Sequence, residues 1–440
     1  MKFFVHRLGC PKNDVDADYI CARLQNEGHM PVEHPEEAES IIVNTCGFIL
    51  PAKEESIEEI LRLAQLKNGG GLKRLYVSGC LSQRYGDELL SGMPEIDGAF
   101  GIGELDAIAV AMTSTDHAVR TIRTPARKLT YMDYERRYLS DSLPYAYLKI
   151  SDGCNRGCTY CVIPGIRGPF RSRPIESIVR EARRLAQSGR KELILVSQDA
   201  TLYGGDLRGP GSLIELLEAL DEIDEVAWIR VMYLHPAQVN GELIDYMASA
   251  NKTLTYFDLP LQHINTELLR AMGRGTDRRT IENLLRSIRA RCDGAVLRTT
   301  FIVGFPGESS KQFAELCDFV DEQHFDRMGM FTYSVEEGTP AAGMTGQVTE
   351  KTKARRLDRL MSLQREIAID KNVSLIGAVR EVIIDSVNAD GIALGRTRGD
   401  CPQIDQEVRV RGFTGTAGDI HRVRIDAADG YDLEGTCREE

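Results

Sequence analysis

The sequence predicts an α/β protein in three parts: an N-terminal parallel α/β domain, an open (β/α)6 partial barrel and a small C-terminal β-barrel. Over most of the chain, short apolar strands alternate with amphipathic helices, which is typical of parallel sheets. The last stretch instead holds short strands separated by glycine turns, which is typical of a small β-barrel. At 440 residues the chain is also too long for a single hydrophobic core.

The first part is expected over residues 1–113. Its expected elements alternate in type, with strands at 2–9, 40–45 and 74–78 and helices at 17–27 and 52–66. This βαβ order implies a parallel sheet. The segment that follows, 114–143, is polar, lacks periodicity and is rich in Arg and Thr, so we expect a linker there.

The second part, 144–370, repeats the alternation six times. Strands are expected at 146–151, 193–198, 228–234, 256–261, 296–304 and 328–334. Helical patterns lie between them at 175–187, 213–223, 283–292 and 312–321. Six β/α units make three quarters of the usual eight, so the barrel is expected to be open on one side.

The third part, 371–440, follows an amphipathic helix expected at 351–370. Its strands are expected at 380–387, 392–397, 407–412 and 423–426. This part carries 13 Asp and Glu against 9 Lys and Arg, a net charge of −4. An acidic module suits a basic partner better than a phosphate backbone.

The composition restricts the class of protein. No apolar run is long enough to cross a bilayer, and the first ten residues lack the apolar segment of a signal peptide, so we expect a cytoplasmic protein without membrane contact. Eleven cysteines in a reducing compartment favour metal ligation or redox chemistry over disulfides. The net charge of −12 disfavours nucleic acid as the main partner.

Three cysteines lie within eight residues, directly after the first expected barrel strand. Cys154, Cys158 and Cys161 have the spacing C-x3-C-x2-C. Thiolates on a short loop hold iron–sulfur clusters, and three of them leave one iron of a 4Fe–4S cube open. An open iron can chelate S-adenosylmethionine, and an electron from the cluster then releases a 5′-deoxyadenosyl radical. The alternative is structural zinc, but zinc normally has four ligands and no fourth Cys or His lies nearby.

Three further cysteines are scattered in sequence but equivalent in position. Cys10, Cys46 and Cys80 each come just after an expected parallel strand of the first domain. The carboxyl ends of parallel strands meet at one edge of a sheet, so these residues are expected to converge. Neighbouring glycines let the backbone approach a bulky ligand. A second cluster is therefore predicted, the alternative being that these are ordinary buried cysteines.

At this point the sequence resembles the methylthiotransferases of the radical S-adenosylmethionine (SAM) superfamily. The matching motifs extend over the whole chain: L-G-C-P-K-N at 8–13, V-N-T-C-G-F at 43–48, G-C at 79–80, I-S-D-G-C at 150–154, L-P-L-Q-H at 259–263, R-T-T-F-I-V-G-F-P-G-E at 298–308 and Q-I-D at 403–405. The last domain resembles the TRAM module of that family. Pro11 and Lys12 are similar to the branch that modifies an aspartate of a small-subunit ribosomal protein, since the tRNA-modifying branch typically has Gln and Met there.

The resemblance implies roles for both cysteine sets. Cys154, Cys158 and Cys161 would hold the radical-generating 4Fe–4S cluster. Cys10, Cys46 and Cys80 would hold an auxiliary 4Fe–4S cluster that carries the sulfur to be inserted.

Three further residues are candidate SAM contacts by the same resemblance. The superfamily's Gly-Gly-Glu stretch, which helps to hold the methionine amino group, corresponds here to Ser197, Gln198 and Asp199. Gly304 belongs to the fifth-strand motif, and its place after a barrel strand favours packing against the cofactor over a simple tight turn. We therefore expect Ser197, Gln198 and Gly304 to contact SAM.

The implied reaction uses two molecules of SAM. One methylates sulfur on the auxiliary cluster, and the other gives the radical that removes hydrogen from the β-carbon of an aspartate in a basic small-subunit ribosomal protein. An electron donor is also implied. Two alternatives stay open: the same reaction on a tRNA adenosine, and a non-catalytic RNA-binding protein with structural clusters. His235 and His263 follow the third and fourth barrel strands, and the sequence leaves their role open.

Overall fold

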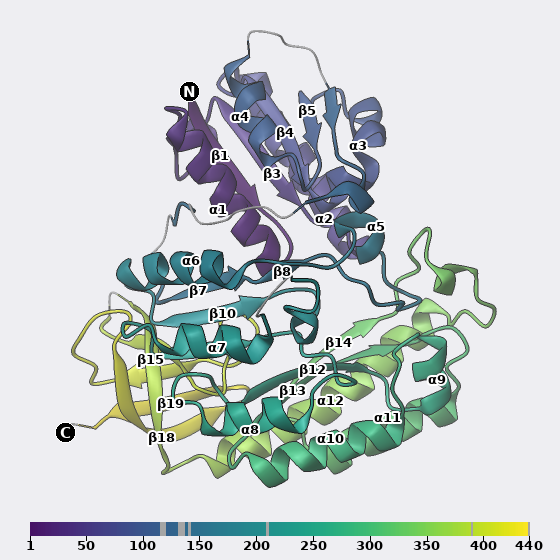
Figure 1. The fold of residues 1–440 in the computed structure, drawn as a ribbon, viewed down its shortest axis with the longest axis vertical. Coiled ribbons are helices and arrows are strands. Elements are labelled where there is room, and N and C mark those ends of the chain that lie inside the picture. The colour runs from purple at the N-terminus through teal and green to yellow at the C-terminus, as the bar shows by residue number, and fades with distance from the viewer. Residues whose placement is uncertain (115–119, 131–136, 140–141, 208–210, 389, 439–440) are drawn as a thin grey trace.

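The computed structural model describes residues 1–114, 120–130, 137–139, 142–207, 211–388 and 390–438. Figure 1 shows three parts: an α/β domain at the top, a curved arrangement of strands and helices in the middle, and a small β-barrel at the lower left. This agrees with the α/β class and the order of architectures predicted from the sequence.

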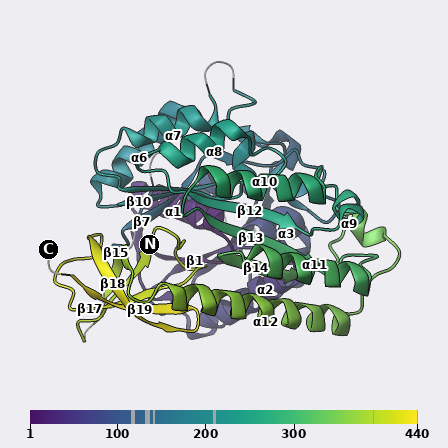
Figure 2. The same cartoon turned by 90° about the horizontal axis from the view of Figure 1, so that it is seen from below.

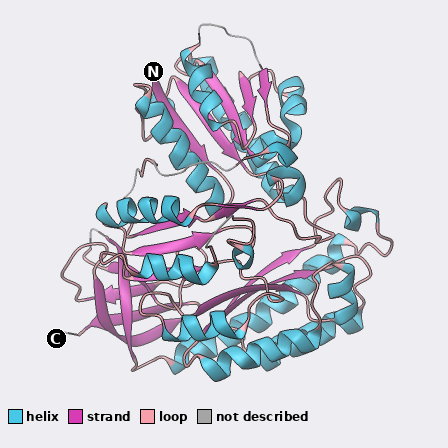
Figure 3. Ribbon diagram, in the orientation of Figure 1, coloured by secondary structure: helices cyan, strands magenta, loops and turns pink. Residues whose placement is uncertain are grey.

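The N-terminal domain contains a parallel sheet with strand order β2-β1-β3-β4-β5-β6. The strands are β1 (Lys2–Arg7), β2 (Met30–Pro31), β3 (Ser40–Thr45), β4 (Arg74–Gly79), β5 (Gly98–Phe100) and β6 (Arg120–Ile122). The helices are α1 (Pro11–Asn26), α2 (Leu50–Ala64), α3 (Cys80–Gly92) and α4 (Leu105–Thr113). Alternate strand residues face opposite sides, so α1 and α4 cover one face and α2 and α3 the other (Figure 3).

Two of the differences from the sequence-based expectation concern helix α1 and the linker. Helix α1 begins at Pro11, six residues earlier than expected, because proline suits the first helical turn and Cys10 adopts an extended N-cap conformation. The stretch expected as a linker, 114–143, contributes β6 to the edge of the sheet. Within that stretch, residues 115–119, 131–136 and 140–141 lie outside the described part of the chain.

The middle part contains six parallel strands in two groups of three, β11-β10-β7 and β12-β13-β14. The strands are β7 (Tyr145–Lys149), β10 (Glu192–Val196), β11 (Trp228–Val231), β12 (Tyr256–Gln262), β13 (Val296–Val303) and β14 (Arg327–Thr332). The covering helices are α6 (Ile175–Gln187), α7 (Leu213–Asp221), α8 (Gly241–Ser249), α9 (Thr266–Ala271), α10 (Arg278–Arg291) and α11 (Ser310–Gln323). A hydrogen bond from Leu234 N to Asp258 O (2.9 Å) links the two groups.

A short excursion separates β7 from α6. It contains β8 (Ser151–Asp152), the 154–161 cysteine loop, α5 (Ile163–Arg167) and β9 (Arg171–Ser172), and β8 pairs antiparallel with β9. This small hairpin closes the base of the cysteine loop.

The C-terminal domain is a closed barrel with strand order β15-β16-β17-β19-β18. Its strands are β15 (Val379–Val387), β16 (Ala393–Thr397), β17 (Val408–Arg411), β18 (Ile420–Asp429) and β19 (Asp432–Cys437). The sequence predicted four strands, and β19 is the one it missed. Helix α12 (Glu350–Ser374) leads into this barrel along β14 and α11, as the view from below shows (Figure 2).

Buried ion pairs attach this C-terminal barrel to the middle part. Arg396 of β16 pairs with Glu192 of β10 (2.6 Å), and Glu192 also accepts from Arg230 of β11 (2.7 Å). Arg298 of β13 lies 3.5 Å from Asp405. Burial raises the pKa of Asp405, an effect that Arg298 opposes. Among the described helices, none is long and apolar enough to span a bilayer.

Candidate active site

The contiguous cysteine set occupies the loop after β8. Gly153 precedes Cys154 with φ 78°, and an ideal Cβ there would lie 2.1 Å from Pro169 O, so only glycine fits. The loop is held by backbone hydrogen bonds, from Cys154 N to Gly168 O (3.1 Å) and from Cys161 N to Cys158 O (3.2 Å). All three thiols lie close enough to influence one another electrostatically.

The scattered set is assembled by the order of strands in the first sheet. β1, β3 and β4 are adjacent, and Cys10, Cys46 and Cys80 follow their carboxyl ends. Cys46 and Cys80 are buried and Cys10 is partly exposed. Asn13 fixes this edge, since its Nδ2 donates to Leu8 O and to Thr45 O (both 3.0 Å).

Glycines let the three strand ends approach one another. Gly9 (φ 98°) precedes Cys10, and an ideal Cβ there would lie 2.9 Å from Cys46 Cβ and 3.3 Å from Cys46 Sγ. Gly79 (φ 93°) precedes Cys80, and its ideal Cβ would lie 2.5 Å from Thr45 O. The structure therefore brings Cys10, Cys46 and Cys80 to one place, as the sequence predicted.

The donor sets fit iron–sulfur clusters. Burial raises the pKa of Cys46 to about 12, with neighbouring Cys80 adding to the effect, and burial likewise raises the pKa of Cys161 to about 12. Such thiols become thiolates only when iron displaces their protons. In the described residues, no three His, Cys, Asp or Glu side chains converge to hold a single metal ion. A cube binds its thiolates through separate irons, so the cysteines need to surround a volume rather than point at one atom.

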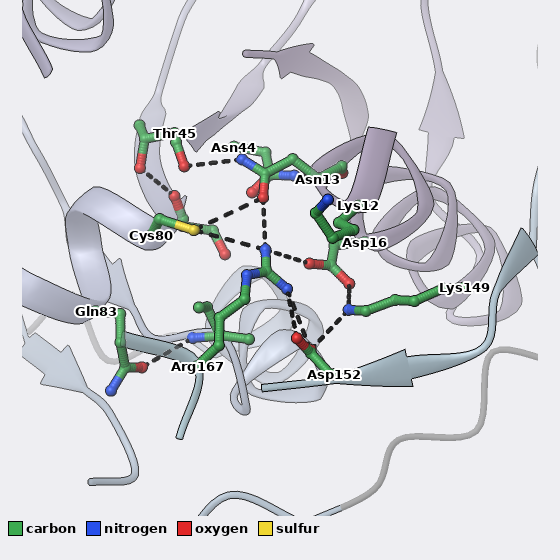
Figure 4. A network of polar contacts seen from close by, with 12 residues as sticks. Lys12, Asn13, Asp16, Asn44, Thr45, Cys80, Gln83, Lys149, Asp152 and Arg167 are labelled. Atoms are coloured by element: carbon green, nitrogen blue, oxygen red, sulfur yellow. Dashed lines mark hydrogen bonds and ion pairs between the residues drawn. The ribbon is translucent and has the colours of Figure 1, made fainter. Parts of the chain in front are cut away.

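A buried charged network connects Cys80 of the scattered set with Asp152 of β8 (Figure 4). Arg167 of α5 donates through Nη2 to Cys80 Sγ (3.5 Å) and through Nη1 to Asp152 (3.1 and 3.2 Å). Asp152 comes two residues before Cys154. Lys149 at the end of β7 bridges Asp152 (2.8 Å) and Asp16 of α1 (2.9 Å). Burial alone would raise the pKa of Asp152, but Arg167 and Lys149 outweigh it and hold this pKa well below its usual range.

Polar atoms without partners collect at the carboxyl ends of β10, β11 and β12. The Oγ of Ser197, the Oε1 of Gln198, the Nε2 of His235 and the Oε1 of Gln262 are buried and have no hydrogen-bond partner among the described residues. Buried polar groups are normally satisfied, so these atoms indicate a polar ligand. Tyr233 and Gln262 at the same ends have φ of 62° and 72°, strained values that cluster at functional sites.

Gln198 and Gly304 also lie at the carboxyl ends of barrel strands, and each contacts further residues of the chain. Gln198 Nε2 donates to Asp152 Oδ1 (3.1 Å), which connects it to the charged network. Gly304 has φ 77°, its N–H donates to Glu308 Oε2, and its ideal Cβ would lie 2.3 Å from Lys353 Cγ of α12. Packing against Lys353 is therefore a sufficient reason for glycine at 304.

The two histidines differ in environment. His235 Nδ1 accepts from Ala237 N (3.3 Å), and burial, assisted by Arg274 and Arg156, lowers the pKa of His235 to about 2. His235 is therefore neutral and offers Nε2–H as a donor. His263 is fully buried, with Nε2 3.5 Å from Glu308 Oε1.

Two arginines were missed from the sequence. Each directs a guanidinium at one cysteine set: Arg167 at Cys80 and Arg274 at Cys158 (Nη1 to Sγ, 3.4 Å). Arg274 also donates to Pro260 O (2.6 Å). In the structure both arginines lie next to glycines with positive φ, Gly168 beside Arg167 and Gly273 and Gly275 beside Arg274.

The fold and the site define a class of protein, and comparisons with known proteins agree. The chain matches the Radical SAM superfamily over residues 148–320, the Uncharacterized protein family UPF0004 over 2–101 and the TRAM domain over 376–437. The structure of the radical S-adenosylmethionine methyltransferase TsrM from Kitasatospora setae aligns with a TM-score of 0.56 at 17% identity, covering 75% of this chain and 72% of that one. The protein is a radical SAM enzyme with a TRAM domain.

Curated relatives narrow the class. Proteins of Clostridioides difficile (43% identical, 99% of this chain, 98% of theirs), Pelotomaculum thermopropionicum (45%, 97% and 97%) and Bdellovibrio bacteriovorus (43%, 97% and 95%) are all named "Ribosomal protein uS12 methylthiotransferase RimO". The chain belongs to this RimO family of methylthiotransferases.

Proposed function

We propose that this protein adds a methylthio group to the β-carbon of an aspartate in ribosomal protein uS12. The observation that carries the proposal is the meeting of two three-cysteine sets at one charged junction, because the reaction needs a radical and a sulfur donor close together. Relatives that match nearly the full chain carry uS12 in their name, which favours this function over tRNA methylthiolation and over a non-catalytic RNA-binding role.

We assign each cysteine set a 4Fe–4S cluster, with Cys154, Cys158 and Cys161 beside the SAM site and Cys10, Cys46 and Cys80 at the auxiliary position. When bound, these clusters and SAM supply a 5′-deoxyadenosyl radical and a methylthio group. An electron donor from outside the chain is required. The division into 1–113, 114–143, 144–370 and 371–440 then has a meaning: the cluster domain, a connection, the radical core and the TRAM-like barrel.

The chain's own residues bind and orient the reactants. We assign Ser197 and Gln198 to the SAM site because each has a buried polar atom without a partner in the described structure. The proposed contact of Gly304 would be through its backbone, since Lys353 lies where a side chain would point. Neutral His235 offers a hydrogen-bond donor at the same end of the barrel. Burial of these groups keeps water away from a reactive radical.

The acidic C-terminal domain supports a basic partner, but several of its acids have other roles. Asp400 and Asp405 face the middle part, where they form ion pairs with Arg327 and Arg298. Asp426 accepts from Arg424 (2.8 Å) and Thr436 (2.6 Å), and Asp432 accepts from Glu407 N (3.0 Å). Lysine at Asp426 or Asp432 would therefore disturb the β18–β19 hairpin as well as any docking surface. Exposed Asp429 is the cleaner position to test docking.

The test is mass spectrometry of ribosomal proteins and tRNA from cells with and without this gene. We expect uS12 to be heavier by about 46 Da on one aspartate only when the gene is present. Methylthiolated adenosine that depends on the gene, with unchanged uS12, would contradict the proposal. Because uS12 is a ribosomal protein, the reaction is proposed to take place in the cytoplasm.

A further inference from the structure

Lys12 reaches from the N-terminal domain to the carboxyl ends of the barrel strands. Its Nζ donates to Ser197 O at the end of β10 (3.2 Å) and lies 3.8 Å from the centroid of the Tyr233 ring, just past β11. The residue is only 8% exposed and comes two positions after Cys10. The charged end of Lys12 is therefore buried at the carboxyl end of the barrel, beside the auxiliary cysteine set.

The carboxylates around Lys12 are already paired with other cations. Asp199 pairs with Arg156 (2.7 Å), Asp258 with Arg298 (2.9 Å), and Asp152 with Arg167 and Lys149. Within the described part of the chain, no carboxylate lies at ion-pair distance from Lys12 Nζ. Tyr233 offers a cation–π contact and Ser197 O accepts one of the three N–H donors of the ammonium. Buried charges are normally compensated, so this ammonium indicates an anionic ligand.

The contact with Ser197 places Lys12 at the edge of the proposed SAM site. Ser197, whose carbonyl accepts from Lys12, is fully buried, and its hydroxyl, assigned above to SAM, has no partner in the described structure. Arg274 is a buried cation without a carboxylate partner too, but its donors reach Cys158 Sγ and Pro260 O on the radical side. On the side of the proposed sulfur donor, Arg167 is already paired with Asp16 and Asp152, whereas Lys12 has no carboxylate partner in the described part of the chain.

We propose that Lys12 binds the side-chain carboxylate of the substrate aspartate and so selects an acidic residue as the substrate. This inference rests on the proposed function. The β-carbon is one bond away from that carboxylate. An ion pair with Lys12, two residues from Cys10, therefore holds the β-carbon between the auxiliary and radical cysteine sets. An uncharged side chain of the same shape, such as asparagine, cannot form this ion pair with Lys12.

The experiment compares two versions of uS12, one with the modified aspartate and one with asparagine in its place, on the reconstituted holoenzyme. The enzymes are wild type, Lys12→Gln, Lys12→Met and Lys12→Arg. Discrimination is measured as the ratio of kcat/KM for the two versions. It is measured again by competition, in which the asparagine version inhibits turnover of the aspartate version. Competition gives an answer even if asparagine is never modified.

We expect wild type to favour aspartate by about 30-fold or more, because removing one partner of a buried charge pair is that costly. Lys12→Gln and Lys12→Met should lower kcat/KM for the aspartate version by a similar factor. In both variants, the ratio of kcat/KM for the two versions should be close to one, and the asparagine version should compete about as well as the aspartate version. Iron content and substrate-free SAM cleavage should stay near wild type. Lys12→Arg keeps the charge and should retain most of the discrimination. Two neutral variants protect the test against one of them failing to fold.

Lys53→Gln is the matched control. Lys53 also connects the N-terminal domain to the barrel, but its Nζ pairs with Glu336 of the chain itself (2.8 Å), so discrimination should be unchanged. Wild-type discrimination in both neutral variants would overturn the inference. Loss of substrate-free SAM cleavage with a raised KM for SAM would also overturn it, since Lys12 would then serve the cofactor. A wild-type enzyme that modifies no ribosomal protein would instead refute the proposed function.

Discussion

The two cysteine sets reach similar arrangements by different means. Cys154, Cys158 and Cys161 share one loop, held by backbone hydrogen bonds within the loop and to Gly168 and Met272, and by the β8–β9 hairpin. Cys10, Cys46 and Cys80 lie on three separate connections and meet only because β1, β3 and β4 are neighbours in a parallel sheet. The first set is a local property of the sequence. The second is a property of the fold, so changes in the sheet should affect it selectively.

The largest expected effect comes from removing one cysteine of each set. Cys158→Ala should lose SAM cleavage and the methylthiolated product together, since an incomplete cluster cannot present an open iron. Cys10→Ala should still form 5′-deoxyadenosine but no product. Product and 5′-deoxyadenosine are measured by mass spectrometry, and iron is counted per chain. Wild-type protein that never holds more than one cluster, or a loaded Cys10→Ala variant without cleavage, would contradict the division of roles.

The next effect tests whether the scattered set depends on the sheet. Gly79→Ala would place a Cβ 2.5 Å from Thr45 O in a conformation essentially limited to glycine, so the N-terminal domain should lose about 3 kcal/mol or more of unfolding free energy. The variant should lose auxiliary iron while keeping iron at the 154–161 loop. Iron content and urea unfolding are the measurements.

Gly70→Ala is the control for a positive φ without close contacts. Gly70 has φ 75° and ψ 0°, the left-handed region that alanine can enter at modest cost, and nothing lies within 4 Å of its ideal Cβ, whereas Gly79 has φ 93° and ψ −155°. Gly70→Ala should lower the unfolding free energy by about 1 kcal/mol and keep both clusters. Equal iron loss in the two variants would mean that close approach of the strands is not what holds the scattered set.

The same contrast explains what the sequence could predict. The 154–161 loop is readable from spacing, and the six β/α units from periodicity. The convergence of Cys10, Cys46 and Cys80 followed from the rule that parallel strands end at one edge. Arg167 and Arg274 escaped prediction because their contacts with Cys80 and Cys158 join segments 87 and 116 residues apart. The spacing of a sequence carries no record of such pairings.

A further test addresses the link between the sets. Arg167 is fully buried and donates to both Cys80 Sγ and Asp152, and hydrogen bonds and positive charge near cluster sulfurs raise reduction potentials. In Cys158→Ala protein, which isolates the auxiliary cluster, Arg167→Lys should lower its midpoint potential and alter its electron paramagnetic resonance spectrum. The charge is kept, so folding should survive better than with a neutral residue.

Arg171→Lys provides the comparison for that measurement. Arg171 is close by in the chain, but its Nη1 donates to the carbonyl oxygens of Arg167 and Pro169 rather than to a thiol. In the Cys158→Ala background, Arg171→Lys should leave the spectrum and the midpoint potential of the auxiliary cluster as they are in the Cys158→Ala protein. An unchanged potential in Arg167→Lys would show that the guanidinium does not act on the auxiliary set.

The smallest expected effect concerns pH and the barrel alone. The pKa of His235 is lowered to about 2, chiefly by burial, whereas an unfolded histidine titrates near 6.5. As the pH falls below about 6.5, the unfolded state takes up a proton that the folded state refuses until about pH 2. Stability present at neutral pH is therefore lost on acidification, by up to about 1.4 kcal/mol per pH unit.

Between pH 7 and pH 5.5, the unfolding free energy of the wild-type apoprotein should fall by about 1 kcal/mol more than that of His235→Gln. Urea unfolding followed by the fluorescence of Trp228, the chain's single tryptophan, reports on the barrel. His324→Asn, at an exposed histidine, should keep the wild-type loss. Equal losses in wild type and His235→Gln would show that His235 is solvated in the folded protein and does not present a neutral ring to the site.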